Sequence, residues 1–157
     1  TDVRDEKILD THYQMGATFA GLLIRNGEMA CANVGDTRIY RKRGGVLTRL
    51  SLDHTRGAAM LEEGAAPEEA NKKNNVLTQY IGCGMEEIEP NYRQMPVETG
   101  EIFLLTSDGI HTKLTDNELF DLIDEHDSAE TIAQKIMAAA KERGLTDDAT
   151  VVAVKVK

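Results

Sequence analysis

The sequence predicts an α+β fold, and three observations indicate it. The first third alternates short apolar runs with tight-turn residues, which is typical of antiparallel strands joined by hairpins. Two apolar, β-branched runs, near 102–106 and 150–154, indicate buried strands. Two stretches between those runs carry helical periodicity and helix-capping residues. With 157 residues, the chain fits a single domain over 1–157 with room for a substantial core.

Four strands are expected in the first third of the chain. An apolar run ends before Asn26-Gly27, and this dipeptide is the strongest short hairpin signal. Turn residues then separate three further strand-like runs, while residues 3–13 are polar and compatible with a helix. The expected strands, paired as one antiparallel meander, are 19–24, 29–34, 37–41 and 46–50.

Residues 55–75 differ in character from the strands before them. A short helix is expected over residues 58–64, where it ends at Gly64. Residues 67–75 are polar, and a loop is expected there. Further strands are expected at 76–80 and 88–95, and at 101–107 after a turn.

Two helices separate the 101–107 strand from the last strand. Thr115 and Glu118 form a capping-box pattern at the start of a helix over 115–124. Ser128 can cap a second helix over 129–142. Apolar residues recur at helical spacing in both, so we expect one face of each helix to pack on the core.

Acidic residues mark the ends of the two buried strands. Asp108 follows the 102–106 run after one residue, Ser107, and Asp147 and Asp148 precede the 150–154 run with only Ala149 between. Asp108 has an alternative interpretation as a turn residue, because Asp-Gly is common in turns. Adjacent aspartates repel each other unless a cation neutralises them, and hard divalent cations prefer oxygen ligands. The sequence therefore predicts a divalent-cation site at Asp108 and the Asp147–Asp148 pair.

Composition restricts the classes of partner. The net charge is -9, which argues against nucleic acid, since binding a phosphate backbone needs a cationic surface. The sequence has no apolar run near the roughly 18–20 residues of a membrane helix and begins with no signal-like segment. The two cysteines, Cys31 and Cys83, suit a reduced protein better than a disulfide framework, although one disulfide stays open. We therefore expect a cytoplasmic protein that binds neither membranes nor nucleic acid.

Six motifs in one order resemble those of the metal-dependent protein serine/threonine phosphatases of type 2C (PPM-type). Any one of them alone would be weak evidence, but their shared order across residues 15–154 makes chance a poor explanation. The motifs are Met15-Gly16-Ala17-Thr18, Asn33-Val34-Gly35-Asp36-Thr37-Arg38, Leu52-Asp53-His54-Thr55, Leu77-Thr78-Gln79-Tyr80-Ile81-Gly82, Ser107-Asp108-Gly109 with Leu114-Thr115-Asp116-Asn117-Glu118-Leu119, and Asp147-Asp148-Ala149-Thr150.

The resemblance implies a fold and a reaction. The fold would be a sandwich of two packed antiparallel β-sheets flanked by helices. The reaction would be hydrolysis of phosphoserine and phosphothreonine in proteins by a metal-activated water, with two Mg or Mn ions in the complete domain. Asp108 and Asp147 would be metal ligands, and no side chain would act as nucleophile. Residues 55–75 would form a flap-like segment that borders the active site.

The resemblance covers only the later two-thirds of such a domain. The family's early motifs, an Arg near an acidic pair and Asp-Gly-x-Gly-Gly-His, do not occur in this sequence. We therefore expect the N-terminal part of the domain to be missing, and the isolated chain to be nearly inactive. A sheet face normally covered by that part would be open to association. A non-catalytic, phosphatase-like regulatory or binding module is the alternative function.

Several other residues are weaker candidates for the site. Gly109 and Asp148 adjoin the predicted ligands, and His54 lies close to the flap-like segment. Asp10 is a candidate for a peripheral metal, because the family's ligand would fall near it, at Thr11. Asp36 and Arg38 are interpreted as a structural pair of turn aspartate and strand arginine.

Overall fold

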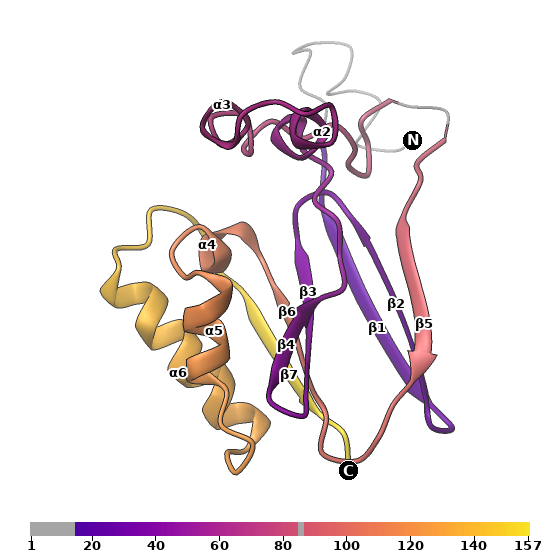
Figure 1. The fold of residues 1–157 in the computed structure, drawn as a ribbon, viewed down its shortest axis with the longest axis vertical. Helices are drawn as coiled ribbons and strands as arrows, with labels where there is room; N and C mark the ends of the chain where they lie inside the picture. Colours follow the sequence, from indigo (N-terminus) through magenta and orange to yellow (C-terminus); the bar gives the residue numbers. More distant parts are fainter. Residues whose placement is uncertain (1–14, 85–86) are drawn as a thin grey trace, which may run out of the picture.

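Two antiparallel sheets packed face to face form the centre of the molecule (Figure 1). The computed structural model describes residues 15–84 and 87–157. One sheet has the order β1-β2-β5 and the other the order β4-β3-β6-β7. Helices α4, α5 and α6 cover the outer face of the four-stranded sheet, and α2 and α3 lie at one end of the sandwich (Figure 1). The expected α+β sandwich is confirmed. The strands are β1 Phe19–Arg25, β2 Glu28–Val34, β3 Arg38–Arg43, β4 Val46–Arg49, β5 Asn91–Pro96, β6 Ile102–Thr106 and β7 Val151–Lys155.

The first hairpin forms where the sequence predicts it. Strands β1 and β2 pair from Phe19 opposite Val34 to Arg25 opposite Glu28. Asn26 and Gly27 both have positive φ angles, 53° and 76°. A two-residue hairpin turn of this kind matches the twist of the flanking strands, which explains why Asn-Gly is such a strong signal.

The four early strands do not form one meander, so that part of the prediction is wrong. Strand β2 pairs with β1 and β5, whereas β3 pairs with β4 and β6 in the other sheet. The chain crosses between the sheets at Gly35, whose φ is 93°. Strand β3 is buried on both faces, because Ile39 packs between the sheets and Tyr40 packs towards the helices. The backbone N–H and C=O groups along both edges of such a buried strand need hydrogen-bond partners. Strand β4 supplies them on one edge and β6 on the other.

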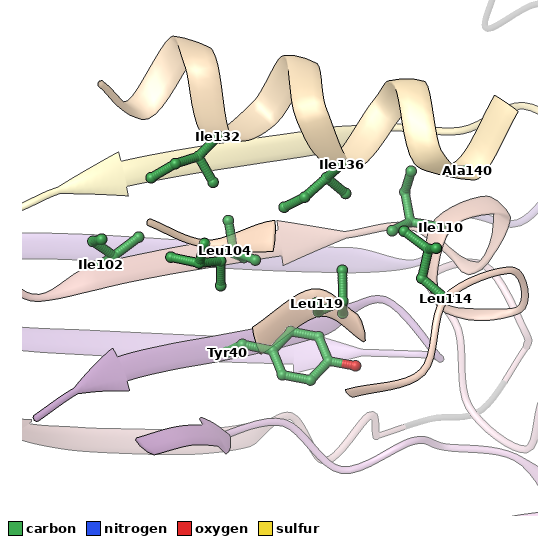
Figure 2. Packing of buried hydrophobic residues seen from close by; sticks show 10 residues of the cluster. Tyr40, Ile102, Leu104, Ile110, Leu114, Leu119, Ile132, Ile136 and Ala140 are labelled. Carbon is green, nitrogen blue, oxygen red and sulfur yellow. The ribbon is translucent and has the colours of Figure 1, made fainter. Parts of the chain in front are cut away.

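Two apolar clusters hold the three layers together. The cluster between the sheets contains Met29, Cys31, Ile39, Leu50 and Phe103. The cluster beneath the helices is larger. Ile132 and Ile136 of α6 point from the helix towards Leu104 of β6 (Figure 2).

The late helices agree with the prediction to within a residue or two. Helix α5, Asp116–Leu122, begins with the full capping box of Thr115 and Glu118. Helix α6, Ala129–Glu142, is capped by Ser128 and buries Ile132, Ile136 and Ala140 along one face. Capping thus correctly located both helix starts.

The middle of the chain departs most from the prediction. Helix α2 is Arg56–Glu62, and the stretch predicted to be loop contains helix α3, Pro67–Asn71. Proline stands at the start of α3, where its missing N–H has no cost. Residues 76–80 do not form a strand and contribute one isolated bridge, Leu77 to Thr55.

The outer face of the three-stranded sheet carries exposed apolar side chains. Leu23 is 63% exposed, Tyr92 59% and Phe19 46%. Gly21, Ala32 and Tyr92 stand opposite one another in register across β1, β2 and β5. Exposed apolar groups gathered on one sheet face favour burial against another surface.

Association through this face is therefore our first prediction. The 157-residue chain should bind a hydrophobic dye and sediment as more than a monomer. Leu23→Lys should reduce both effects, whereas Val46→Lys, at a residue 60% exposed on β4, should change neither. A monodisperse monomer that binds no dye would contradict the prediction.

Candidate functional site

Asp108 lies where the central strand gives way to a short helix. Strand β6 ends at Thr106, Ser107 is the N-cap, and Asp108 is the first residue of α4, Asp108–His111. Two hydrogen bonds tie this junction to the start of β7. Ser107 N–H donates to the Thr150 carbonyl (3.0 Å), and Thr150 N–H donates to Ser107 Oγ (2.9 Å). The ends of the two buried strands therefore meet, as the sequence indicates.

Gly109 lets the two segments approach closely. A Cβ at this position would lie 2.5 Å from the Asp148 carbonyl oxygen and 3.0 Å from Ala149 Cα. Any side chain would thus push the Asp148–Ala149 segment away from the start of α4. Each of the two predicted ligands also accepts a local backbone hydrogen bond of 2.8 Å, Asp108 from Gly109 N–H and Asp147 from Asp148 N–H. A carboxylate can accept about four hydrogen bonds, so both retain capacity for a ligand.

A polar pocket of about 440 Å³ opens beside Asp108. Its lining joins the end of β2, the start of β3, helix α4 and the flap-like segment. Asp147 is not among the lining residues, so the structure does not place its carboxylate in this pocket. The lining residues are Asp36, Arg38, Asp53, Asn71, Lys72, Asn74, Asn75, Asp108, His111 and Thr112.

Arg38 pairs with Asp53 and not with Asp36, so the predicted Asp36–Arg38 pair is wrong. Arg38 Nη2 lies 2.6 Å from Asp53 Oδ2, and Arg38 Nε donates to the same carboxylate at 3.1 Å. Strand geometry explains this, because Asp53 follows the β3–β4 hairpin back to the start of β3. Arg49 adds a second cation 3.6 Å from Asp53 Oδ2. The Asp53 charge is thus compensated within the pocket wall.

Asp36 is a pocket carboxylate that the sequence analysis missed as a site residue. Burial raises the pKa of Asp36, and the nearby negative charge of Asp108 raises it further. The two carboxylates are therefore close enough to repel each other. One signal in the sequence could have identified Asp36, since it follows a buried strand just as Asp108 does.

Two histidines contact the Gly35–Asp36 turn. Gly35 N–H donates to His54 Nδ1 at 3.2 Å, and His111 Nε2 lies 2.9 Å from the Asp36 carbonyl oxygen. His54 therefore supports the turn and is not a pocket residue. The peripheral candidate Asp10 lies outside the described residues.

The donor set suits a hard cation but does not by itself make a full coordination shell. Asp36 and Asp108 place carboxylate oxygens in the pocket lining, and oxygen is the ligand type that Mg²⁺ and Mn²⁺ prefer. Within residues 15–84 and 87–157, no three histidine, cysteine, aspartate or glutamate side chains come together as a metal-binding group. A cation held here by this chain would keep several water ligands.

The flap-like segment forms one wall of the pocket through Asn71, Lys72, Asn74 and Asn75. Few large apolar side chains anchor it, and Leu61 of α2 is 45% exposed. We expect backbone amides in 57–75 to exchange with solvent faster than those of β6, because little apolar area is buried there. Hydrogen exchange measured by mass spectrometry tests this. Equal protection in the two segments would contradict the expectation.

Comparison with known proteins places the chain in a family. Residues 5–157 match the family model described as Stage II sporulation protein E (SpoIIE). The chain is 31% identical to protein phosphatase PhpP of Streptococcus pneumoniae over 143 residues, which cover 89% of the chain and 58% of PhpP.

Two solved structures share the fold. The structure of PppA, titled a key regulatory component of T6SS in Pseudomonas aeruginosa, is 31% identical with a TM-score of 0.86, and the match covers 99% of the chain and 64% of PppA. The catalytic domain of serine/threonine protein phosphatase PstP, in complex with two manganese ions, is 26% identical with a TM-score of 0.80, over 98% of the chain and 65% of that domain.

The chain thus spans between 58% and 65% of these three relatives, in agreement with a partial domain. In the described part of the chain, no helix has the length and apolar character needed to cross a membrane. The match to the family model covers nearly the whole sequence, and PhpP and PstP are both named as protein phosphatases. The chain therefore belongs to the PP2C-type protein serine/threonine phosphatase family, through the domain described as Stage II sporulation protein E.

Proposed function

We propose that this chain is part of a phosphatase domain that hydrolyses phosphoserine and phosphothreonine in proteins, with Mg²⁺ or Mn²⁺ as cofactor. One observation carries the proposal. Asp108 stands at the junction of β6 and α4, against the start of β7, at the edge of a pocket that also holds Asp36. The manganese ions in the structure of PstP support the choice of metal.

Residues in and beside the pocket have distinct roles in this proposal. Asp108 and Asp147 would hold a cation, and Gly109 would keep their two segments in contact. A bound Mg²⁺ or Mn²⁺ supplies an activated water and neutralises charge on phosphate oxygens. Asp36 adds negative charge beside Asp108, while Asp53 is neutralised by Arg38. Lys72 places a cation of the flap-like segment on the pocket wall, where it can attract an anionic phosphoprotein.

The substrate class and the compartment follow from charge and composition. A net charge of -9 favours phosphorylated segments that are otherwise basic. The protein is proposed to act in the cytoplasm, because a chain of 157 residues with only two cysteines suits a reducing compartment.

The experiment that tests the function is hydrolysis of a phosphothreonine peptide by the full-length protein. Phosphate release should require Mn²⁺ or Mg²⁺ and should stop when a chelator is added. Specific binding of the peptide without phosphate release would favour the alternative, a non-catalytic phosphatase-like binding module. One observation favours this alternative. In the described part of the chain, no three acidic, histidine or cysteine side chains come together as a metal-binding group.

A further inference from the structure

The turn that carries Asp36 is held by histidines from two other segments. His54 forms two hydrogen bonds with Gly35. The backbone N–H of His54 donates to the Gly35 carbonyl (2.9 Å), and the ring Nδ1 of His54 accepts from the Gly35 N–H (3.2 Å). The next peptide group is held from the opposite side, where His111 Nε2 lies 2.9 Å from the Asp36 carbonyl oxygen. Consecutive peptide groups are thus fixed to the β4–α2 connection and to helix α4.

The chemistry of these contacts fixes the proton on each ring. A carbonyl oxygen only accepts, so His111 Nε2 must carry the hydrogen. His54 Nδ1 accepts, so it must lack one. Burial lowers the pKa of both histidines, and the positive charge of Arg38 lowers that of His111 further. The two contacts thus place the proton of each ring on Nε2.

Helix α4 connects the hydrogen bond between His111 and Asp36 to the predicted metal ligand Asp108. Asp108 and His111 are three residues apart, which places them on one side of the single turn of α4, and both line the pocket. Ser107 and Gly109 fix the start of α4 against the segment before β7. His111 therefore links the Asp36 turn to the same rigid unit that carries Asp108.

Like charges would otherwise drive the two carboxylates apart. Asp36 and Asp108 approach closely enough for their charges to interact, and a flexible turn would relieve that repulsion by moving Asp36 outward. We propose that His111 is a positioning residue whose Nε2–H hydrogen bond to the Asp36 carbonyl fixes the separation of the Asp36 and Asp108 carboxylates and so sets the pocket's affinity for a divalent cation. The effect on cation affinity rests on the proposed function, whereas the positioning of Asp36 by His111 does not.

Two substitutions separate the hydrogen bond from the bulk of the ring. His111→Leu fills similar volume but donates nothing, whereas His111→Gln can place an amide N–H where Nε2 lies. The exposed His126, changed to Gln, is the matched control. Mn²⁺ titration calorimetry on the full-length protein, at a temperature where all variants are folded, should show about tenfold weaker binding for His111→Leu. His111→Gln and His126→Gln should bind within about threefold of the original protein, as expected when the orienting hydrogen bond is kept.

A metal-free measurement tests the same hydrogen bond independently. Long-range ¹H–¹⁵N spectra should show the Nε2–H tautomer at His111, and the Asp36 carbonyl resonance should shift in His111→Leu but not in His111→Gln. Unchanged Mn²⁺ affinity in His111→Leu would overturn the inference while leaving the metal site intact. An Nδ1–H tautomer at His111 would also overturn it. If the original protein binds no Mn²⁺ but shows the expected tautomer and shift, the proposed function fails and the positioning of Asp36 stands.

Discussion

Asp108→Asn and Asp147→Asn should each lower Mn²⁺-dependent phosphopeptide hydrolysis by the full-length protein at least about 100-fold. Each change removes the charge of a predicted ligand and keeps the volume of the side chain. The fold should persist, because both residues lie outside the strands and each accepts a hydrogen bond from its own local backbone. Phosphate release at saturating Mn²⁺ measures the effect, and circular dichroism monitors the fold.

Asp36→Asn is the comparison for these two variants. The amide removes the charge that faces Asp108, and the backbone contact with His111 stays. We expect its main effect on Mn²⁺ affinity and on stability, with a smaller loss of turnover at saturating metal. If Asp108→Asn turns over substrate at the original rate, the turn interpretation of Asp108 is correct and its assignment as a ligand is wrong.

The second large effect concerns stability. Arg41 binds Glu101 through two hydrogen bonds, Nε to Oε2 at 2.8 Å and Nη2 to Oε1 at 2.6 Å, and Glu101 is 3% exposed. Breaking a buried ion pair leaves one charge uncompensated. Glu101→Gln should therefore lower the free energy of unfolding by about 3 kcal/mol. Denaturant unfolding measures this difference.

An exposed ion pair nearby provides the control. Glu98 pairs with Arg43 on the same side of the sheet, but both side chains are largely exposed. Glu98→Gln should cost about 0–1 kcal/mol, since water and salt screen such pairs. Equal losses in the two variants would show that burial does not govern the Arg41–Glu101 interaction.

The sequence correctly predicted the elements that begin or end at a turn or capping residue. The Asn26-Gly27 turn fixed the register of β1 and β2, and the Thr115–Glu118 box located the start of α5. The strand ends at Asp108 and Asp147 were also predicted to meet, and the Ser107–Thr150 hydrogen bonds show that they do.

Long-range pairing could not be predicted in the same way. A tight turn shows that the chain reverses, but not whether the next strand stays in the same sheet, and β3 joined the other sheet through β6. Likewise, Asp36 and Asp53 are equally plausible partners for Arg38 in sequence. Only the return of the β3–β4 hairpin decides in favour of Asp53, while Asp36 shares the pocket with Asp108.

Location of Mn²⁺ by anomalous diffraction, in crystals of the full-length protein, tests the central claim most directly. The account predicts an anomalous peak within about 2.0–2.6 Å of a carboxylate oxygen of Asp108, with Asp147 in the same coordination shell. Mn²⁺ bound elsewhere, with both carboxylates outside its coordination shell, would contradict it.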